Sequence, residues 1–169
     1  MGLDLTAMHA AHGALRLELE QLARIAVGDD PGRVLRTAPG WQLFTRTLHS
    51  HYRTEDELLW PALRRRAGRP GELVPLEALE AEHAALGEVV AAIDTLLAGP
   101  EVDPVWLGDL LDSLIAGLRG HLAHEEQAAI PLITRLLTPQ EWTAFEQVHH
   151  RRIGTTLTRA PADRWTARA

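Results

Sequence analysis

Apolar residues recur along the chain in alternating steps of three and four positions, the spacing of a helix that buries one face. Four long stretches carry this spacing, at residues 5–22, 44–62, 76–97 and 107–132. The pattern predicts four helices that pack against one another as a bundle.

Residues that interrupt helices separate the four stretches. They lie at residues 28–32, 68–70 and 99–100, where Gly occurs with Pro. Asp103 supplies an N-cap directly before Pro104, and Thr138 does the same before Pro139. We therefore expect a fifth, shorter helix from Pro139 to about residue 153. Residues 154–169 show no periodicity and are expected to form a C-terminal tail.

The chain repeats one pattern at an offset of about 70 residues. A His that is followed four positions later by Glu, and then by a second acid, occurs at His51 and again at His121. A proline lies ten positions after each of them, and the preceding helix of each half carries a lone His, His12 or His83. Short connections make consecutive helices antiparallel neighbours. The predicted fold class is all-α, an up-down-up-down four-helix bundle with an internal two-fold repeat and a short C-terminal helix, over residues 1–153.

Six polar residues lie on the same stripes as the leucines and should point into the core. They are His12, His51, Glu55, His83, His121 and Glu125. An ionised carboxylate loses its hydration when it is buried and needs a compensating partner. The chain supplies too few inward-facing cations, so a pair of divalent metal ions is the partner we predict.

The spacing of these residues suits two ions. His and Glu at positions i and i+4 lie above one another on a helix face, so both can reach one ion. The second and fourth helices each offer such a pair, and the first and third helices each add one imidazole. Each ion would then have two imidazoles, with both carboxylates placed to bridge. A mixed His/carboxylate pocket with vacant positions favours two non-haem iron ions, with manganese or zinc as alternatives.

Composition narrows the chemistry further. The chain has no cysteine, which excludes disulfides, Fe–S clusters and thiol catalysis. A net charge of −6 argues against a nucleic-acid-binding surface. No apolar run is long enough to span a membrane and no secretory signal is visible, so a cytoplasmic protein is expected. All 17 basic residues are Arg and Asn is absent, which suggests a GC-rich bacterial genome.

Over residues 4–137 the sequence resembles the haemerythrin-like (HHE cation-binding) domains. The resemblance rests on His-x3-Glu-Asp…Trp-Pro at His51, on His-x3-Glu-Glu…Ile-Pro at His121, and on the lone histidines His12 and His83. It implies that the irons lie between all four helices and that the second and fourth helices each supply a His and a bridging carboxylate. Members of the family carry or sense oxygen, handle nitric oxide or peroxide, or sense iron.

The sequence departs from the oxygen carriers of that family, whose third helix holds two histidines four residues apart. Here Gly87 lies four positions after His83. The site is then more open, or another residue substitutes. Three candidates for an additional ligand are His9 and Glu80, each three residues before a lone His, and Tyr52, where some family members place a ligand.

Three functions follow from this pattern. The first is a di-iron protein that binds a small diatomic or peroxide ligand for binding, sensing or detoxification. The second is a di-iron oxidase, oxygenase or catalase-like enzyme, which open positions on both irons would favour. The third is an iron- or oxygen-responsive regulatory module whose partner surface would include Trp142, Phe145 and Trp165; its protein partner is not predicted.

Other residues receive structural interpretations. Pro61 and Pro131 each remove a helical hydrogen bond and are expected to kink or stop their helices. His149 and His150 lie near two arginines on the fifth helix and are expected to form a solvated face. His124, directly before Glu125, is a candidate partner for a ligand rather than a ligand itself.

Overall fold

The computed structural model describes residues 2–153 and 164–166, and these residues form helices and their connections without a strand. The all-α prediction is confirmed. The bundle consists of two uninterrupted helices and two helices that contain a π-helical segment. They are α1 (Thr6–Ala26), α3–η1–α4 (Gly40–Thr54, Glu55–Leu59, Trp60–Arg66), α5 (Val74–Ala98) and α6–η3–α7 (Pro104–His124, Glu125–Ala129, Ile130–Leu136).

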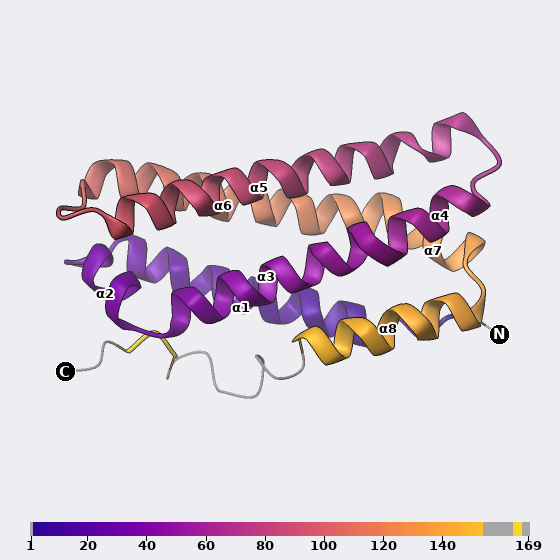
Figure 1. Cartoon of the computed structure of the whole chain (residues 1–169), viewed down its shortest axis with the longest axis horizontal. Coiled ribbons are helices and arrows are strands. Elements are labelled where there is room, and N and C mark those ends of the chain that lie inside the picture. The colour runs from indigo at the N-terminus through magenta and orange to yellow at the C-terminus, as the bar shows by residue number, and fades with distance from the viewer. Residues whose placement is uncertain (1, 154–163, 167–169) are drawn as a thin grey trace.

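The four long helices lie side by side along the length of the molecule (Figure 1). Helix α1 packs against α6 and α3, and α5 packs against α6 and α3, so each helix has two neighbours around a closed ring. This is the predicted four-helix bundle. Its two π-helical segments lie at an offset of 70 residues, from Glu55 to Glu125, as the internal repeat requires.

Two further helices cover the bundle. Helix α8 (Pro139–Ile153) begins and ends where the fifth helix was expected and lies mainly along α3. Helix α2 (Pro31–Thr37) was not expected, because its Pro-Gly start reads as a turn. It forms because the Asp30 side chain accepts a hydrogen bond from the backbone N–H of Arg33, and Pro31 suits the first helical turn.

Pro61 and Pro131 were expected to kink or stop their helices, and the structure shows that they do not stop them. The backbone N–H of Trp60 donates to the carbonyl of Glu55, five residues back, and that of Ile130 donates to the carbonyl of Glu125. The wider turn accommodates the proline that follows, which has no N–H of its own, and the helix continues beyond it.

The same π-helical segments shift the buried positions by one residue. Continued by three positions from Glu55 and from Glu125, the three-four spacing predicts Leu58 and Ala128 on the inner stripe. In the structure Leu59 and Ala129 are buried instead, while Leu58 is 37% exposed. A π-helical turn contains an extra residue, so the inward direction passes to the next position along the chain.

The core consists of two apolar clusters with a polar layer between them. On α1 His12 lies between Met8, which belongs to one cluster, and Leu15, which belongs to the other. On α5 His83 lies in the same way between Leu79 and Leu86. The polar residues therefore sit at one level of the bundle, closed off at both ends by apolar side chains.

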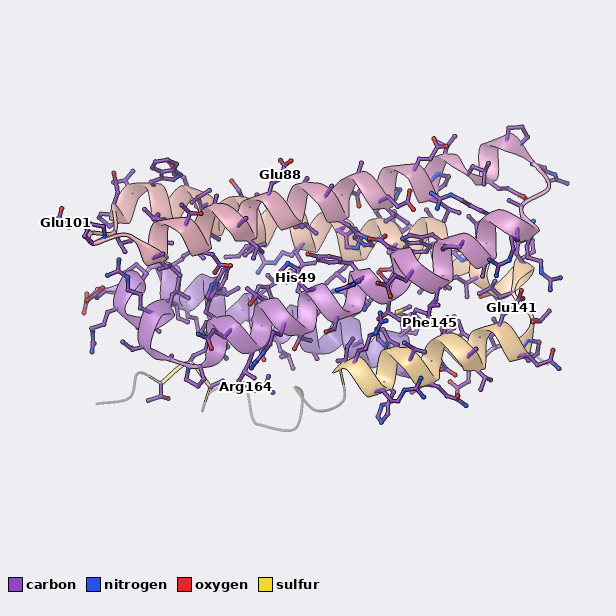
Figure 2. All side chains as sticks on the ribbon, in the orientation of Figure 1. His49, Glu88, Glu101, Glu141, Phe145 and Arg164 are labelled. Atoms are coloured by element: carbon purple, nitrogen blue, oxygen red, sulfur yellow. The ribbon has the colours of Figure 1, made fainter. Side chains whose placement is uncertain are left out.

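The aromatic residues that were considered as a partner surface are buried. Trp142 and Phe145 face inward from α8, as Figure 2 shows for Phe145, and Trp165 packs over Gly40 at the start of α3.

The predicted tail falls largely on residues 154–163 and 167–169, which lie outside the described residues. No helix of the described part is both long and apolar enough to cross a membrane.

Candidate metal centre

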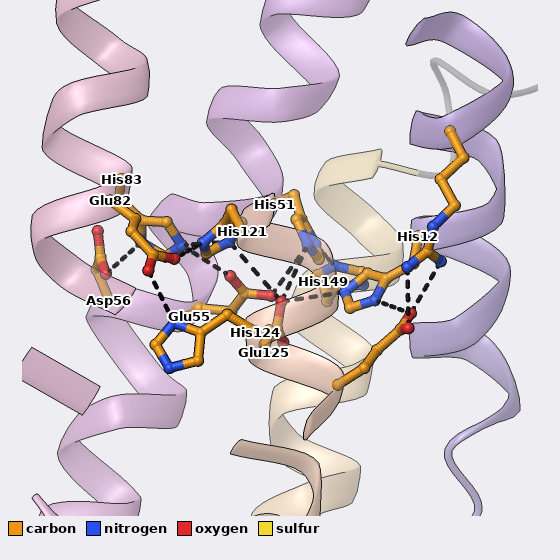
Figure 3. Close-up of polar contacts among 12 residues, drawn as sticks. His12, His51, Glu55, Asp56, Glu82, His83, His121, His124, Glu125 and His149 are labelled. Carbon is orange, nitrogen blue, oxygen red and sulfur yellow. Dashed lines mark hydrogen bonds and ion pairs between the residues drawn. The ribbon is translucent and has the colours of Figure 1, made fainter. Parts of the chain in front are cut away.

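The structure brings all six predicted core residues together. His12 comes from α1, His51 from α3, His83 from α5 and His121 from α6, while Glu55 and Glu125 are the first residues of the two π-helical segments. All six are buried, with side chains directed to the middle of the bundle (Figure 3).

Their ligand atoms form two groups. In the first group one atom from each of His12, His51, Glu55 and Glu125 lies within 4.8 Å of the others, and in the second group the same is true of Glu55, His83 and His121. Glu55 belongs to both groups. Its Oε1 is 3.2 Å from Nε2 of His51 and its Oε2 is 3.5 Å from Nε2 of His83. A carboxylate whose two oxygens face different imidazoles is placed to bridge two ions.

Most inner polar atoms of the cluster lack hydrogen-bond partners, although Nε2 of His83 lies 3.1 Å from Nε2 of His121. Both oxygens of Glu55, both oxygens of Glu125, and Nε2 of His12 and His51 are buried and unpaired. Buried polar groups almost always have a partner, because leaving one unsatisfied costs about 1–3 kcal/mol. The unpaired atoms are lone-pair acceptors of the kind that bind divalent metals, so this set of donors fits a metal centre.

Outer partners orient the four imidazoles. Nδ1 lies 2.9 Å from Glu126 Oε1 in His12, 2.8 Å from Asp56 Oδ1 in His83 and 2.9 Å from Glu82 Oε2 in His121. The fourth imidazole, His51, has its Nδ1 2.8 Å from Nε2 of His149. A partner on Nδ1 keeps the proton there and directs an unprotonated Nε2 toward the centre.

Two of these partners link the halves of the repeat. Asp56 follows Glu55 in the first half and contacts His83 of the second, whereas Glu126 follows Glu125 in the second half and contacts His12 of the first. Glu126 also accepts two hydrogen bonds from Arg16, at 2.9 Å each, and this pairing lowers the pKa of the Glu126 carboxyl to about 2. It therefore stays ionised beside His12.

Without a metal, Glu55 and His51 both favour their uncharged forms. Burial, reinforced by the negative charge of Glu125, raises the pKa of Glu55 well above its usual 4.5. Burial and the neighbouring histidines lower the pKa of His51 well below 6.5. A cation placed between these groups would reverse the effect on the carboxylate, because it stabilises the ionised form.

The three candidates for additional ligands lie outside both groups. His9 is exposed on α1, and Glu80 accepts hydrogen bonds from Arg64 at 2.7 and 2.5 Å. Tyr52 stacks on His83 with ring centroids 5.0 Å apart, and a Cβ at Gly87 would lie 3.7 Å from its hydroxyl. Burial raises the pKa of Tyr52 to about 12, so it remains a phenol. The Tyr52 side chain thus lies beside Gly87, the position where the oxygen carriers of the family hold a further histidine.

The interpretation of His149 as part of a solvated face is wrong, although His150 is exposed. His149 is 5% exposed, because α8 lies along α3 and turns this residue inward. The spacing of Trp142, Phe145, His149 and Ile153 is itself a helical stripe and could have indicated it. No pattern in the sequence indicated Glu82 as part of the site. Its two carboxylate oxygens contact Nδ1 of His121 and, at 2.7 Å, Nδ1 of His124.

This four-helix bundle, with a buried His/Glu cluster at mid-height, defines a class of helical cation-binding protein. The family model of the Hemerythrin HHE cation binding domain matches residues 3–133. The chain belongs to this family, and its family and buried cluster together indicate a metal-ion site. No curated protein and no solved structure shows a significant match to the chain.

Proposed function

We propose that the chain is a non-haem di-iron protein that binds a small ligand, O2, NO or a peroxide, for its binding, sensing or detoxification. The convergence of Nε2 and carboxylate atoms in two groups that share Glu55, with both Glu55 oxygens lacking a hydrogen-bond partner, supports this proposal. Two iron ions held there, with Glu55 between them, would supply the ligand-binding positions.

Several features of the chain favour iron over a structural zinc. The two groups mix imidazole with carboxylate and contain no thiolate, a donor set that suits non-haem iron. The second group offers three protein residues, Glu55, His83 and His121, which leaves positions for an external ligand. The apolar clusters on both sides of the polar layer keep water away from the ions.

The three-residue group also supports a second candidate function. Two histidines and one carboxylate around an ion are typical of iron enzymes that activate oxygen. Under this alternative the chain is a di-iron oxidase, oxygenase or catalase-like enzyme. Multiple turnovers of peroxide or of an organic substrate would favour the enzyme, whereas reversible binding without turnover would favour the first proposal.

The first experiment measures metal content after loading with ferrous iron, followed by ultraviolet–visible spectra with oxygen, peroxide or nitric oxide. We expect about two irons per chain, the number that the two ligand groups predict, and absorption bands that change when the ligand is added. A stoichiometric zinc load with no spectral response, or no iron at all, would contradict the proposal.

Variants test which residues hold the metal. His51→Ala and His121→Ala should each reduce the iron content and the stabilisation that iron provides. A ligand at 100 times its Kd stabilises the folded state by about 2.7 kcal/mol, and each variant should lose most of this difference between loaded and metal-free protein. His150→Ala is the matched control, because His150 is exposed and should leave both quantities unchanged. Full iron content in both ligand variants would contradict the assignment.

A further inference from the structure

Helix α8 lies beyond residues 3–133, which the cation-binding family model matches, yet it contributes a side chain to the centre. Nε2 of His149 is 2.8 Å from Nδ1 of His51, and both side chains are buried (Figure 3). The four-helix bundle alone does not provide this contact.

Contacts on both sides of His149 hold α8 in place. Near its end, Arg152 donates to Thr54 Oγ1 at 3.1 Å and to Glu57 Oε2 at 2.7 Å, both close to the π-helical turn that carries Glu55. Near its start, the indole N–H of Trp142 donates to the carbonyl of Asp4 at 2.8 Å. These contacts fix the helix directly beside the centre.

Within α8 the ring of His149 is itself supported. Phe145 stacks on it at 5.2 Å between centroids, which restricts rotation of the imidazole. The geometry therefore holds one nitrogen of His149 against His51.

His149 differs in charge from the partners of the other three histidines. Glu126, Asp56 and Glu82 are carboxylates, whereas His149 is an imidazole. A His51 that binds metal through Nε2 carries its proton on Nδ1 and donates it to Nε2 of His149.

We propose that His149 is a positioning residue of the metal centre: it accepts the Nδ1–H of His51 and holds the His51 imidazole toward the ion that His12 and His51 share. This inference rests on the proposed metal site.

The two metal positions then differ in their surroundings. The His83–His121 position is backed by two carboxylates, Asp56 and Glu82, whereas the His12–His51 position is backed by Glu126 and the imidazole of His149. Carboxylate partners make an imidazole more basic, so His51, whose partner is an imidazole, lacks this contribution and relies on His149 for its orientation. Loss of His149 should therefore weaken one of the two positions.

The experiment measures iron release from the full-length, ferrous-loaded chain to an excess of a ferrous chelator, for wild type, His149→Leu and His149→Gln. Leu fills part of the space but accepts no hydrogen bond, whereas the Gln carbonyl can accept one. We expect His149→Leu to release one iron per chain roughly 10–100 times faster, the usual effect of removing an outer partner. His149→Gln should restore most of the wild-type rate. His150→Leu is the matched control on the exposed neighbour.

Metal-free stability provides a second measurement that separates positioning from folding. The positioning role is supported if three results hold together. Iron release is faster in His149→Leu than in wild type, His149→Gln restores the wild-type rate, and the metal-free forms of all three proteins are equally stable. Equal release rates in wild type and His149→Leu would overturn this inference while leaving the di-iron proposal intact. The inference would also be overturned if His149→Gln released iron as fast as His149→Leu. Wild-type protein that binds no iron would overturn both proposals.

Discussion

At the scale of single residues, the centre is defined by Glu55. It is buried, lacks a hydrogen-bond donor to either oxygen, and faces His51 on one side and His83 on the other. A carboxylate in this position is unstable as an anion in the metal-free protein and useful as a bridge once cations are present. Its burial is a cost to the metal-free fold and a source of metal affinity.

This predicts how the stability of the metal-free protein changes with pH. Because burial raises the pKa of Glu55, the folded chain keeps the Glu55 proton to a higher pH than the unfolded chain, whose carboxyl titrates near the usual 4.5. The unfolding free energy should therefore fall as pH rises toward the raised pKa, by at most about 1.4 kcal/mol per pH unit for one proton. The lowered pKa of His51 has the opposite effect, so that the unfolding free energy rises with pH, but only below pH 6.5.

The measurement is urea unfolding of metal-free wild type and Glu55→Gln between about pH 6.5 and 9, the window set by the histidine and tyrosine values. Burial works to lower the pKa of His12, but the carboxylates of Glu125 and Glu126 outweigh burial and raise it. The unfolding free energy therefore also falls with rising pH because of His12, and it does so in wild type and in Glu55→Gln alike. The difference between the curves isolates Glu55: wild type should lose more stability as pH rises. Parallel curves would contradict the prediction.

At the scale of elements, the π-helical segments decide which side chains face inward. Each segment begins at a buried carboxylate of the cluster, Glu55 or Glu125, and ends two residues before a proline. Upstream, His51 and Glu55 keep the i, i+4 spacing of one face, at 3.2 Å between Nε2 and Oε1. Downstream, the extra residue rotates the helix, so that Leu59 enters the core.

A pair of neighbouring substitutions tests this register. Leu59→Ala should reduce the unfolding free energy by about 2–5 kcal/mol, because it removes a fully buried side chain. Leu58→Ala, at a position that is 37% exposed, should reduce it by about 1 kcal/mol or less. An uninterrupted α-helix would reverse the order. Denaturant unfolding of the two variants and wild type decides between the registers.

At the scale of the whole molecule, segments far apart in sequence close the bundle. Arg164 and the indole N–H of Trp165 bind the buried carboxylate of Glu18 on α1, at 2.9 and 2.7 Å. Trp165 also fills the space above Gly40, where an added Cβ would overlap the indole Cδ2. Arg164 and Trp165 thus pack against α1 and the start of α3.

A double-mutant cycle tests this packing. Gly40→Ala should destabilise the wild type by about 1–3 kcal/mol, because the methyl group overlaps the indole. In the Trp165→Ala background the same substitution should have little effect, since the space is open. Trp165→Ala itself should reduce stability by about 3–5 kcal/mol. If Gly40→Ala had the same effect in both backgrounds, Trp165 would not pack there.

The local pattern of the sequence predicted the four long helices, the later helix α8, their order and the six inner residues of the centre, but not α2. Helical periodicity is local, and a polar residue on an apolar stripe can be located without knowledge of its neighbours in space. Asp56 and Glu126 are part of the repeated motif, so their presence near the centre could also have been foreseen from the acids that follow Glu55 and Glu125.

Only the tertiary structure decided the partners of the imidazoles and the register after each ligand carboxylate. Glu82 reaches His121, and His149 reaches His51, because particular helices are neighbours and are rotated so that these side chains meet. The burial of Leu59 in place of Leu58 depends on whether the backbone bonds four or five residues back. The sequence by itself therefore determined which residues form the centre, while long-range packing and one extra residue per π-helical turn decided how they are held.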